Sequence, residues 1–187
     1  MNLAKSGLIV LGVISIFFIT LLATRGTQSN QANFDLVGEP APLFAAEMIT
    51  GGEFNLEDEL IANRALTPRD QVWIAVNFFA SWCTGCIVEH ADLVTFHTES
   101  AFSSNGTKCN TKLVSVAFND NIKDIEDFFE KYDGDWPVLL DGSTNRVAID
   151  YSVMTAPETV LIAPSGLVVK KIVGPITYEK LSAGIEC

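Results

Sequence analysis

The chain has few basic residues: 12 Lys and Arg stand against 23 Asp and Glu, and the formal net charge is −11. Because a protein that binds a phosphate backbone needs a basic face, this balance argues against a nucleic-acid partner. Four cysteines in 187 residues are too few for a miniature scaffold built on disulfides, although they suffice for one or two functional pairs. The histidines, His90 and His97, are seven positions apart on one expected helix, which predicts solvated helix residues rather than metal ligands.

A long uncharged run lies near the N-terminus. Gly7 to Ala23 contains no charged residue, and as a helix it would span about 25 Å at about 1.5 Å per residue. With Ser6 and Thr24 added, this approaches the hydrocarbon thickness of a bilayer. Lys5 precedes the run and Arg25 follows it, a bias that favours a cytoplasmic N-terminus and an exported remainder.

We therefore expect three parts: a transmembrane anchor or signal over residues 1–24, a polar linker over 25–36 and a folded domain over 37–187. The expected localisation is the cell inner (cytoplasmic) membrane, crossed once, with the domain on the periplasmic, extracytoplasmic side. A cleaved secretory signal is one alternative, and a buried helix of a soluble fold is another. The anchor and the signal both place the folded domain outside the cytoplasm.

The folded part is predicted to alternate strands and helices. An almost continuous apolar run over 72–79 predicts a strand buried on both faces, and a helix with one apolar face follows from Cys83 to about Phe102. Gly51-Gly52 indicates a peripheral hairpin. The remaining pattern predicts strands over 112–118, 136–140, 158–163 and 167–173, and helices over 122–132, 144–151 and 177–185. This order predicts an α/β fold in which helices cover both faces of a central mixed sheet.

The most informative motif is Cys83-Thr84-Gly85-Cys86, which lies where the buried strand ends and the next helix begins. Free amide groups and the helix dipole at a helix N-terminus stabilise an anion, so a thiol placed there ionises more readily than a free thiol. Two intervening residues let Cys86 close a small disulfide over one helical turn. We therefore expect Cys83 to be an exposed attacking thiolate and Cys86 a more buried thiol that resolves the mixed disulfide.

Other interpretations of the four cysteines remain open. The motif is also compatible with half of a zinc site, with Cys109 and Cys187 as the remaining ligands, or with a static structural disulfide. The succession of apolar strand, Trp82, cysteine pair and amphipathic helix favours the redox interpretation. An exported compartment would permit a second bridge between Cys109 and Cys187, and two free thiols fit the sequence equally well.

Three segments of the chain carry a family resemblance. They are Val37 to Pro42, Asn77 to Cys86 and Tyr151 to Thr159. Together they resemble the membrane-anchored thioredoxin-like proteins of the CcmG/DsbE group, with TlpA and ResA as neighbours. The resemblance covers roughly Val37 to Ile185, and it implies a thioredoxin-like fold with an N-terminal hairpin extension and a central insertion.

The resemblance also implies roles for individual residues. Pro157 would be a cis-proline that faces the cysteine pair, and it would bind substrate together with Trp82 and Glu158. Glu89, three residues after Cys86, would be a partly buried acid that relays protons at the thiols. The ordinary alternatives are a trans-proline, a core tryptophan, a surface glutamate and a solvated helix charge.

One departure from the family pattern lies within the motif itself. Gly85 stands where the family usually has proline immediately before the second cysteine. Since proline stiffens a turn and glycine does not, we expect a looser turn here.

The sequence thus predicts a thiol–disulfide oxidoreductase that uses Cys83 and Cys86 and needs neither a cofactor nor a metal. The resemblance implies that its target is apocytochrome c or another disulfide-bearing protein. It also implies that electrons return from a DsbD- or CcdA-type donor. Two alternatives stay open: a TlpA-like reductant for copper-centre assembly, and a non-catalytic metal-binding module.

Overall fold

The computed structural model describes residues 36–102 and 106–187. The expected anchor or signal over residues 1–24 and the linker up to residue 35 lie outside these residues. No helix within the described part of the chain is long and apolar enough to cross a membrane. The expected localisation as a single-pass protein of the inner membrane is therefore contradicted, because each described helix is too short or too polar to span the hydrocarbon layer.

The apolar run forms the central strand of the sheet, β3 (Val72–Phe79), in which every residue from Trp73 onward is buried. The neighbour on one side is β5 (Lys108–Ala117), which is parallel to it, and on the other side β7 (Glu158–Ile162), which is antiparallel. The sheet is therefore mixed, as predicted. A strand that is apolar on both faces needs cover on both faces, and this requirement places helices above and below the sheet.

Shorter strands complete the sheet on either side of this centre. β8 (Val168–Val173) pairs antiparallel with β7, which confirms the predicted hairpin. β4 (Ala101–Phe102) pairs antiparallel with the first residues of β5, and β6 (Val138–Leu140) pairs in parallel with its last residues. The order along the sheet is β4-β5-β3-β7-β8, with β6 beside the far end of β5.

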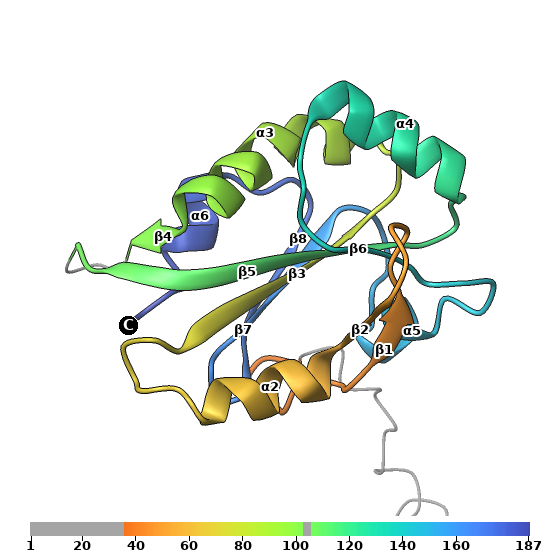
Figure 1. The fold of residues 1–187 in the computed structure, drawn as a ribbon. Helices are drawn as coiled ribbons and strands as arrows, with labels where there is room; N and C mark the ends of the chain where they lie inside the picture. The colour runs from red at the N-terminus through yellow and green to blue at the C-terminus, as the bar shows by residue number, and fades with distance from the viewer. Residues whose placement is uncertain (1–35, 103–105) are drawn as a thin grey trace, which may run out of the picture. The chain divides into compact units, whose positions relative to one another are not determined.

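Helices lie on both faces of the sheet (Figure 1). On one face are α3 (Thr84–Glu99), α4 (Ile122–Tyr132) and α6 (Tyr178–Ser182), and on the other are α2 (Leu56–Arg64) and α5 (Arg146–Asp150). α4 and β6 occupy the middle of the chain, between the strand–helix unit that carries the cysteine motif and the C-terminal hairpin. This arrangement is the helix-covered mixed sheet that the sequence predicted.

The two faces of β3 belong to two different cores. Phe79 packs into the core under α3 and α4, and Phe78 packs into the core that contains Tyr151 and Leu56. Successive strand residues point to opposite faces, so an uninterrupted apolar run can supply both cores at once.

The structure differs from several predicted bounds: β5 begins at Lys108 rather than at 112, and α6 ends at Ser182 rather than at 185. The expected peripheral hairpin is present as β1 (Ala45–Glu47) and β2 (Glu53–Asn55), but helix α2, directly after it, was not predicted. Its signals were Asn55, whose side chain accepts hydrogen bonds from the first turn, and an acidic run in that turn. Helix α3 ends at Glu99, earlier than predicted, because Ser100 adopts a φ of 62° and the following residues pair as β4.

Candidate active site

The cysteine motif lies at the N-terminus of α3, immediately after the end of β3. Cys83 is the N-cap residue of the helix, and its Sγ accepts a hydrogen bond from the backbone N–H of Cys86 at 3.2 Å. Both thiols are free. A backbone donor and the positive end of the helix dipole both stabilise negative charge on the Cys83 sulfur.

The two thiols differ in burial, although less than predicted. Cys83 is 6% exposed and Cys86 is 2% exposed, so the expectation of an openly exposed Cys83 is wrong in degree. Burial raises the pKa of the Cys86 thiol far above its ordinary value, and the hydrogen bond with Cys83 and the charge of Glu89 raise it further. Cys86 is therefore a protonated thiol at neutral pH, and it needs a base before it can act as a nucleophile.

A buried carboxylate is held close to the thiols. Glu89 is 1% exposed; its Oε1 accepts from Asn77 Nδ2 at 2.8 Å and its Oε2 from the backbone N–H of Ile176 at 2.9 Å. Burial raises the pKa of Glu89 to about 7, and the hydrogen bonds from Ile176 and Asn77 act against that rise. This residue is a buried acid with fixed donors, which excludes the alternative of a solvated helix charge.

Gly85, inside the cysteine motif, lies in a sterically crowded part of the site. The Ala156–Pro157 peptide bond is cis, as the family resemblance implied. A Cβ atom placed on Gly85 would lie 2.9 Å from Pro157 Cδ and 3.3 Å from Pro175 Cγ. Two proline rings thus crowd this position, so the absence of a side chain on Gly85 relieves a steric conflict, and the expected looseness of the turn stays a prediction.

Trp82 lies on the surface next to Cys83. Its side chain is 64% exposed, and its Nε1 donates a hydrogen bond to the Asn119 carbonyl at 3.1 Å. The alternative of a plain core tryptophan is thereby excluded. An exposed, anchored indole beside a thiol offers an apolar surface to an incoming chain.

Glu158 follows Pro157 but does not reach the surface. It is 1% exposed, its Oε1 accepts from the backbone N–H groups of Met154 and Thr155 at 2.8 and 3.0 Å, and its Oε2 lies 3.0 Å from Lys171 Nζ. The carboxylate thus orders the loop that leads to Pro157. A direct contact between this carboxylate and a substrate, as predicted from the resemblance, does not fit this burial.

Asn77, Ile176 and Lys171 also belong to the site, and the sequence analysis did not identify them. Asn77 is a buried polar residue inside the apolar strand β3, and that interruption was a usable signal. Ile176 contributes only its backbone N–H, which no side-chain pattern reveals.

The predicted exposure of the histidines is wrong for His90. Its ring is 4% exposed, contacts four aromatic rings of the α4 region, and has Nε2 2.6 Å from the Asp133 carbonyl oxygen. Burial lowers its pKa, so it is a neutral residue of the interface between α3 and α4. His97 lies nearer the surface, and its Nε2 lies 2.7 Å from Asp135 Oδ1.

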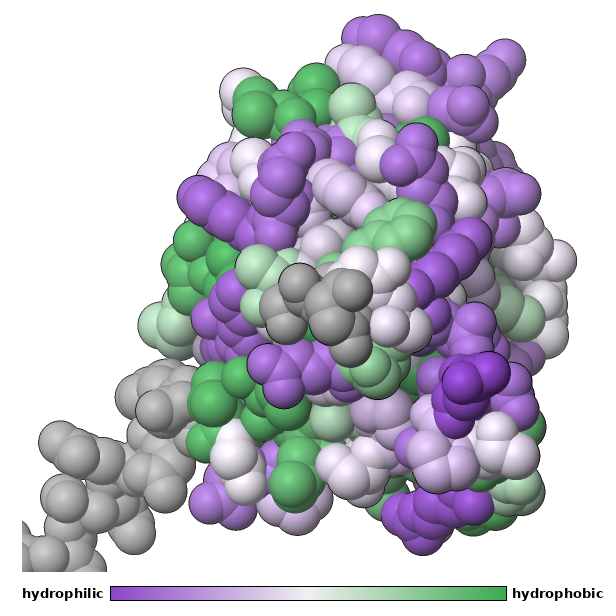
Figure 2. Space-filling view, turned by 90° about the vertical axis from the view of Figure 1, so that its left-hand side faces the viewer, coloured by the Kyte–Doolittle hydropathy of each residue, from purple (hydrophilic) through white to green (hydrophobic). Residues whose placement is uncertain are grey.

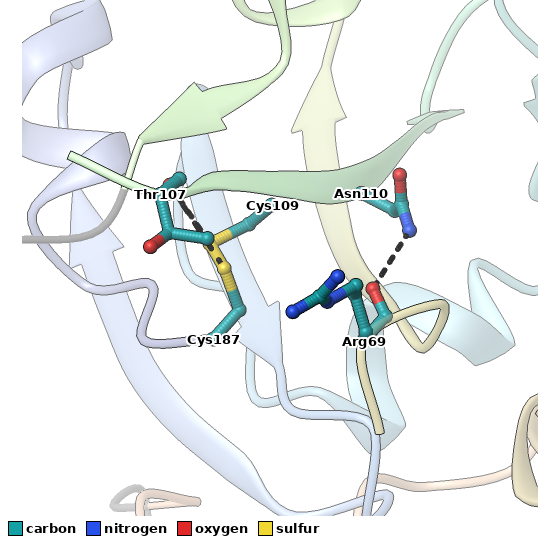
Figure 3. The surroundings of a disulfide bond; sticks show 5 residues. All are labelled: Arg69, Thr107, Cys109, Asn110 and Cys187. Atoms are coloured by element: carbon teal, nitrogen blue, oxygen red, sulfur yellow. Dashed lines mark hydrogen bonds between the residues drawn. A yellow bond between two sulfur atoms is a disulfide. The ribbon is translucent and has the colours of Figure 1, made fainter. Parts of the chain in front are cut away.

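The other two cysteines form a disulfide, Cys109–Cys187, which selects one of the alternatives that the sequence left open (Figure 3). In the register of the sheet, Asn110 pairs with Val72 at the start of β3, whereas Cys83 follows the end of that strand. The two cysteine pairs are therefore separated by the length of β3, roughly 25 Å at about 3.3 Å per residue. This separation is incompatible with one zinc site built from all four cysteines.

Residues 37–171 match the family described as the AhpC/TSA family. The chain belongs to the AhpC/TSA family. Within it, the chain is 30% identical over 180 residues to the thiol:disulfide interchange protein DsbE of Allochromatium vinosum, covering 94% of this chain and 88% of that protein. It is 29% identical over 145 residues to the thiol-disulfide oxidoreductase ResA of Bacillus subtilis, covering 77% and 71%.

A solved structure shows the same fold. A thiol:disulfide interchange protein of the thioredoxin family from Chlorobium tepidum superposes with a TM-score of 0.58, over 76% of this chain and 90% of the other, at 23% identity. This AhpC/TSA family member thus has a thioredoxin-like fold. Together with the DsbE and ResA relatives, the comparison identifies an enzyme of the thiol:disulfide interchange type, which acts on disulfide-bearing proteins.

Proposed function

We propose that this protein reduces the disulfide of apocytochrome c during cytochrome c maturation, with Cys83 as the nucleophile and Cys86 as the resolving thiol. The observation that carries the proposal is the asymmetry of the pair. Cys83 Sγ receives a backbone donor at a helix N-terminus, while Cys86 is buried and its pKa is raised. The resemblance to the CcmG/DsbE group and the similarity to the Allochromatium DsbE support the choice of substrate.

The reaction takes place in two exchange steps. The Cys83 thiolate attacks one sulfur of the target disulfide, forms a mixed disulfide and expels the other target sulfur as a thiolate. Cys86 then passes its proton to the Glu89 carboxylate and attacks Cys83 Sγ, which releases the second target sulfur. The target gains two electrons, the proton that left Cys86 through Glu89 and a second proton from solvent, and the enzyme is left with a Cys83–Cys86 disulfide.

The surface beside Cys83 suits a chain that carries such a disulfide. Trp82 offers an exposed apolar face, and the Pro157 ring lies against Gly85 of the motif. Glu158 acts indirectly here, because it holds the loop of Met154 and Thr155 that leads to Pro157. A DsbD- or CcdA-type donor returns the two electrons by the same exchange chemistry in reverse.

The proposal is tested with a disulfide peptide of the CxxCH type and with trapping in cells. Cys83→Ser should reduce turnover to background, because the attacking sulfur is lost, and Cys86→Ser should accumulate a mixed disulfide with apocytochrome c. Cys109→Ser/Cys187→Ser, which removes the other two sulfurs and leaves the motif intact, is the control and should keep turnover well above background. Full activity in Cys83→Ser would refute the chemistry. Capture of a copper-site assembly protein would support the exchange mechanism but would refute apocytochrome c as the substrate.

A further inference from the structure

The second cysteine pair joins the end of the chain to the sheet (Figure 3). Cys109 is the second residue of β5 and is 1% exposed, whereas Cys187 is the last residue and is exposed. The Thr107 carbonyl oxygen lies 3.7 Å from Cys109 Sγ and 4.0 Å from Cys187 Sγ. The bond therefore fixes the C-terminus against the start of a central strand.

Residues 174–187, here called the C-terminal segment, connect that disulfide to the candidate active site. At its start, Gly174 N–H donates to the Pro157 carbonyl at 2.9 Å, and Pro175 packs against Gly85. Ile176 N–H then donates to Glu89 Oε2 at 2.9 Å. Three consecutive residues of this segment thus contact the cis-proline, the cysteine motif and the buried acid.

Helix α6, in the middle of the segment, is held by tertiary contacts. Tyr178 N–H donates to Asp92 Oδ1 at 2.9 Å, and its hydroxyl donates to the Ser100 carbonyl at 3.0 Å. Leu181 and Ile185 are each 1% exposed. A helix of five residues has little stability of its own, so its position depends on these contacts and on the bond that follows it.

The surface at this end of the sheet is neither uniformly hydrophobic nor uniformly hydrophilic. On the side that carries β4 and the C-terminus, hydrophobic side chains lie in groups divided by hydrophilic ones (Figure 2).

We propose that the Cys109–Cys187 disulfide is a positioning element of the active site. By holding the C-terminal segment on α3, it keeps the Ile176 amide on the Glu89 carboxylate and Pro175 against Gly85. This inference rests on the proposed function, in which Glu89 accepts the proton of Cys86. Without the disulfide the amide donor is held less firmly, the carboxylate loses stabilisation, and the pKa of Glu89 rises above about 7.

Several groups face Glu89, and their charges bear on any pH dependence. On its own helix these are the Cys86 thiol and the Asp92 carboxylate, whose charge raises the pKa of Glu89. From β3 the contact is the neutral amide of Asn77, and from the C-terminal segment it is the backbone amide of Ile176. The Ile176 donor is therefore the contact with Glu89 that the disulfide can influence.

The test compares the full chain with its Cys109→Ala/Cys187→Ala variant, using the rate of reduction of a CxxCH disulfide peptide between pH 5 and 9. A hydrogen bond to a charged group is strong enough to move a pKa by about 1 unit. We therefore expect the midpoint of the rate profile to move up by about 1 pH unit and the rate at pH 7 to fall several-fold. An unchanged midpoint overturns the inference.

Glu89→Gln in both backgrounds is the matched control. With no carboxyl group at position 89, removal of the disulfide should no longer move the midpoint. A shift that persists in the glutamine background would assign the effect to another group and would also overturn the inference. If the unmodified chain fails to reduce the peptide at all, the proposed function fails instead, so the two failures are distinguishable.

Amide hydrogen exchange at Ile176 provides a measurement that does not depend on activity. The disulfide-free variant should exchange this amide at least about tenfold faster, because the donor is released more often. If that variant does not fold, a second variant with two glycines inserted between Glu186 and Cys187 is used. It keeps the disulfide but lengthens the chain between the disulfide and Ile176. Equal exchange at Ile176 in the inserted variant and the unmodified chain would then contradict the proposal.

Discussion

The two cysteine pairs of this protein lie at opposite ends of the central strand and do different work. Cys83 and Cys86 are three residues apart at a helix N-terminus, and both are free thiols. Cys109 and Cys187 are 78 residues apart and bonded, one of them within strand β5, where peptide dipoles alternate and largely cancel. The comparison teaches that the number of cysteines does not distinguish an exchanging pair from a structural bond. The secondary-structure element in which each cysteine lies does.

The largest expected effect that sharpens this comparison is on stability. Removing the Cys109–Cys187 bond with two alanines should lower the free energy of unfolding by about 4 kcal/mol, because the bond closes a long loop in the unfolded chain. Cys83→Ala/Cys86→Ala, which breaks no bond, should cost about 1 kcal/mol. Guanidinium unfolding without reductant measures both variants. A lower stability of Cys83→Ala/Cys86→Ala than of the disulfide-free variant would contradict this distinction between the two pairs.

The next expected effect concerns Glu89 and the pH dependence of stability. Its pKa is about 7 in the folded chain and about 4.3 when unfolded, so between these values the folded state holds a proton that the unfolded state has lost. Stability should therefore fall by about 3 kcal/mol as pH rises from about 4.5 to 7, and this part should be absent in Glu89→Gln. The slope of unfolding free energy against pH is the measurement.

Glutamine at position 89 also carries a constant cost, since its amide group cannot accept from both Asn77 and Ile176 as the carboxylate does. That cost shifts the whole curve without changing its slope. An equal slope in the variant and the unmodified chain would show that Glu89 is already ionised below pH 5, against the expected effect of its burial.

The smallest expected effect is at Gly85. Alanine normally stabilises a helix relative to glycine, but here its Cβ would meet Pro157 Cδ at 2.9 Å. We expect Gly85→Ala to lower the free energy of unfolding by about 1 kcal/mol, because overpacking outweighs helix propensity. Thr84→Ala, at the exposed neighbouring position, should stay within about 0.5 kcal/mol. A stabilised Gly85→Ala would show that the two prolines yield easily.

Much of the fold could be read from local patterns. The predicted bounds of β3 and α4 agree with the structure, since an uninterrupted apolar run and a strongly amphipathic helix are both strong signals. α2 was missed even though Asn55 and the acidic residues after it form an N-terminal capping pattern. The end of α3 was misplaced because pairing of β4 with β5 is a contact between segments, and periodicity carries no information about it.

By itself the sequence determined the reactive motif, because the placement of Cys83 and Cys86 at a strand-to-helix junction depends on neighbouring residues alone. Only the tertiary structure decided the surroundings of that motif: the Ile176 amide on Glu89, the two prolines against Gly85 and the pairing of Cys109 with Cys187. Each of these contacts joins residues that are far apart in the chain. Their distances follow from how the sheet and its covering helices pack, and no local pattern of residue types encodes that packing.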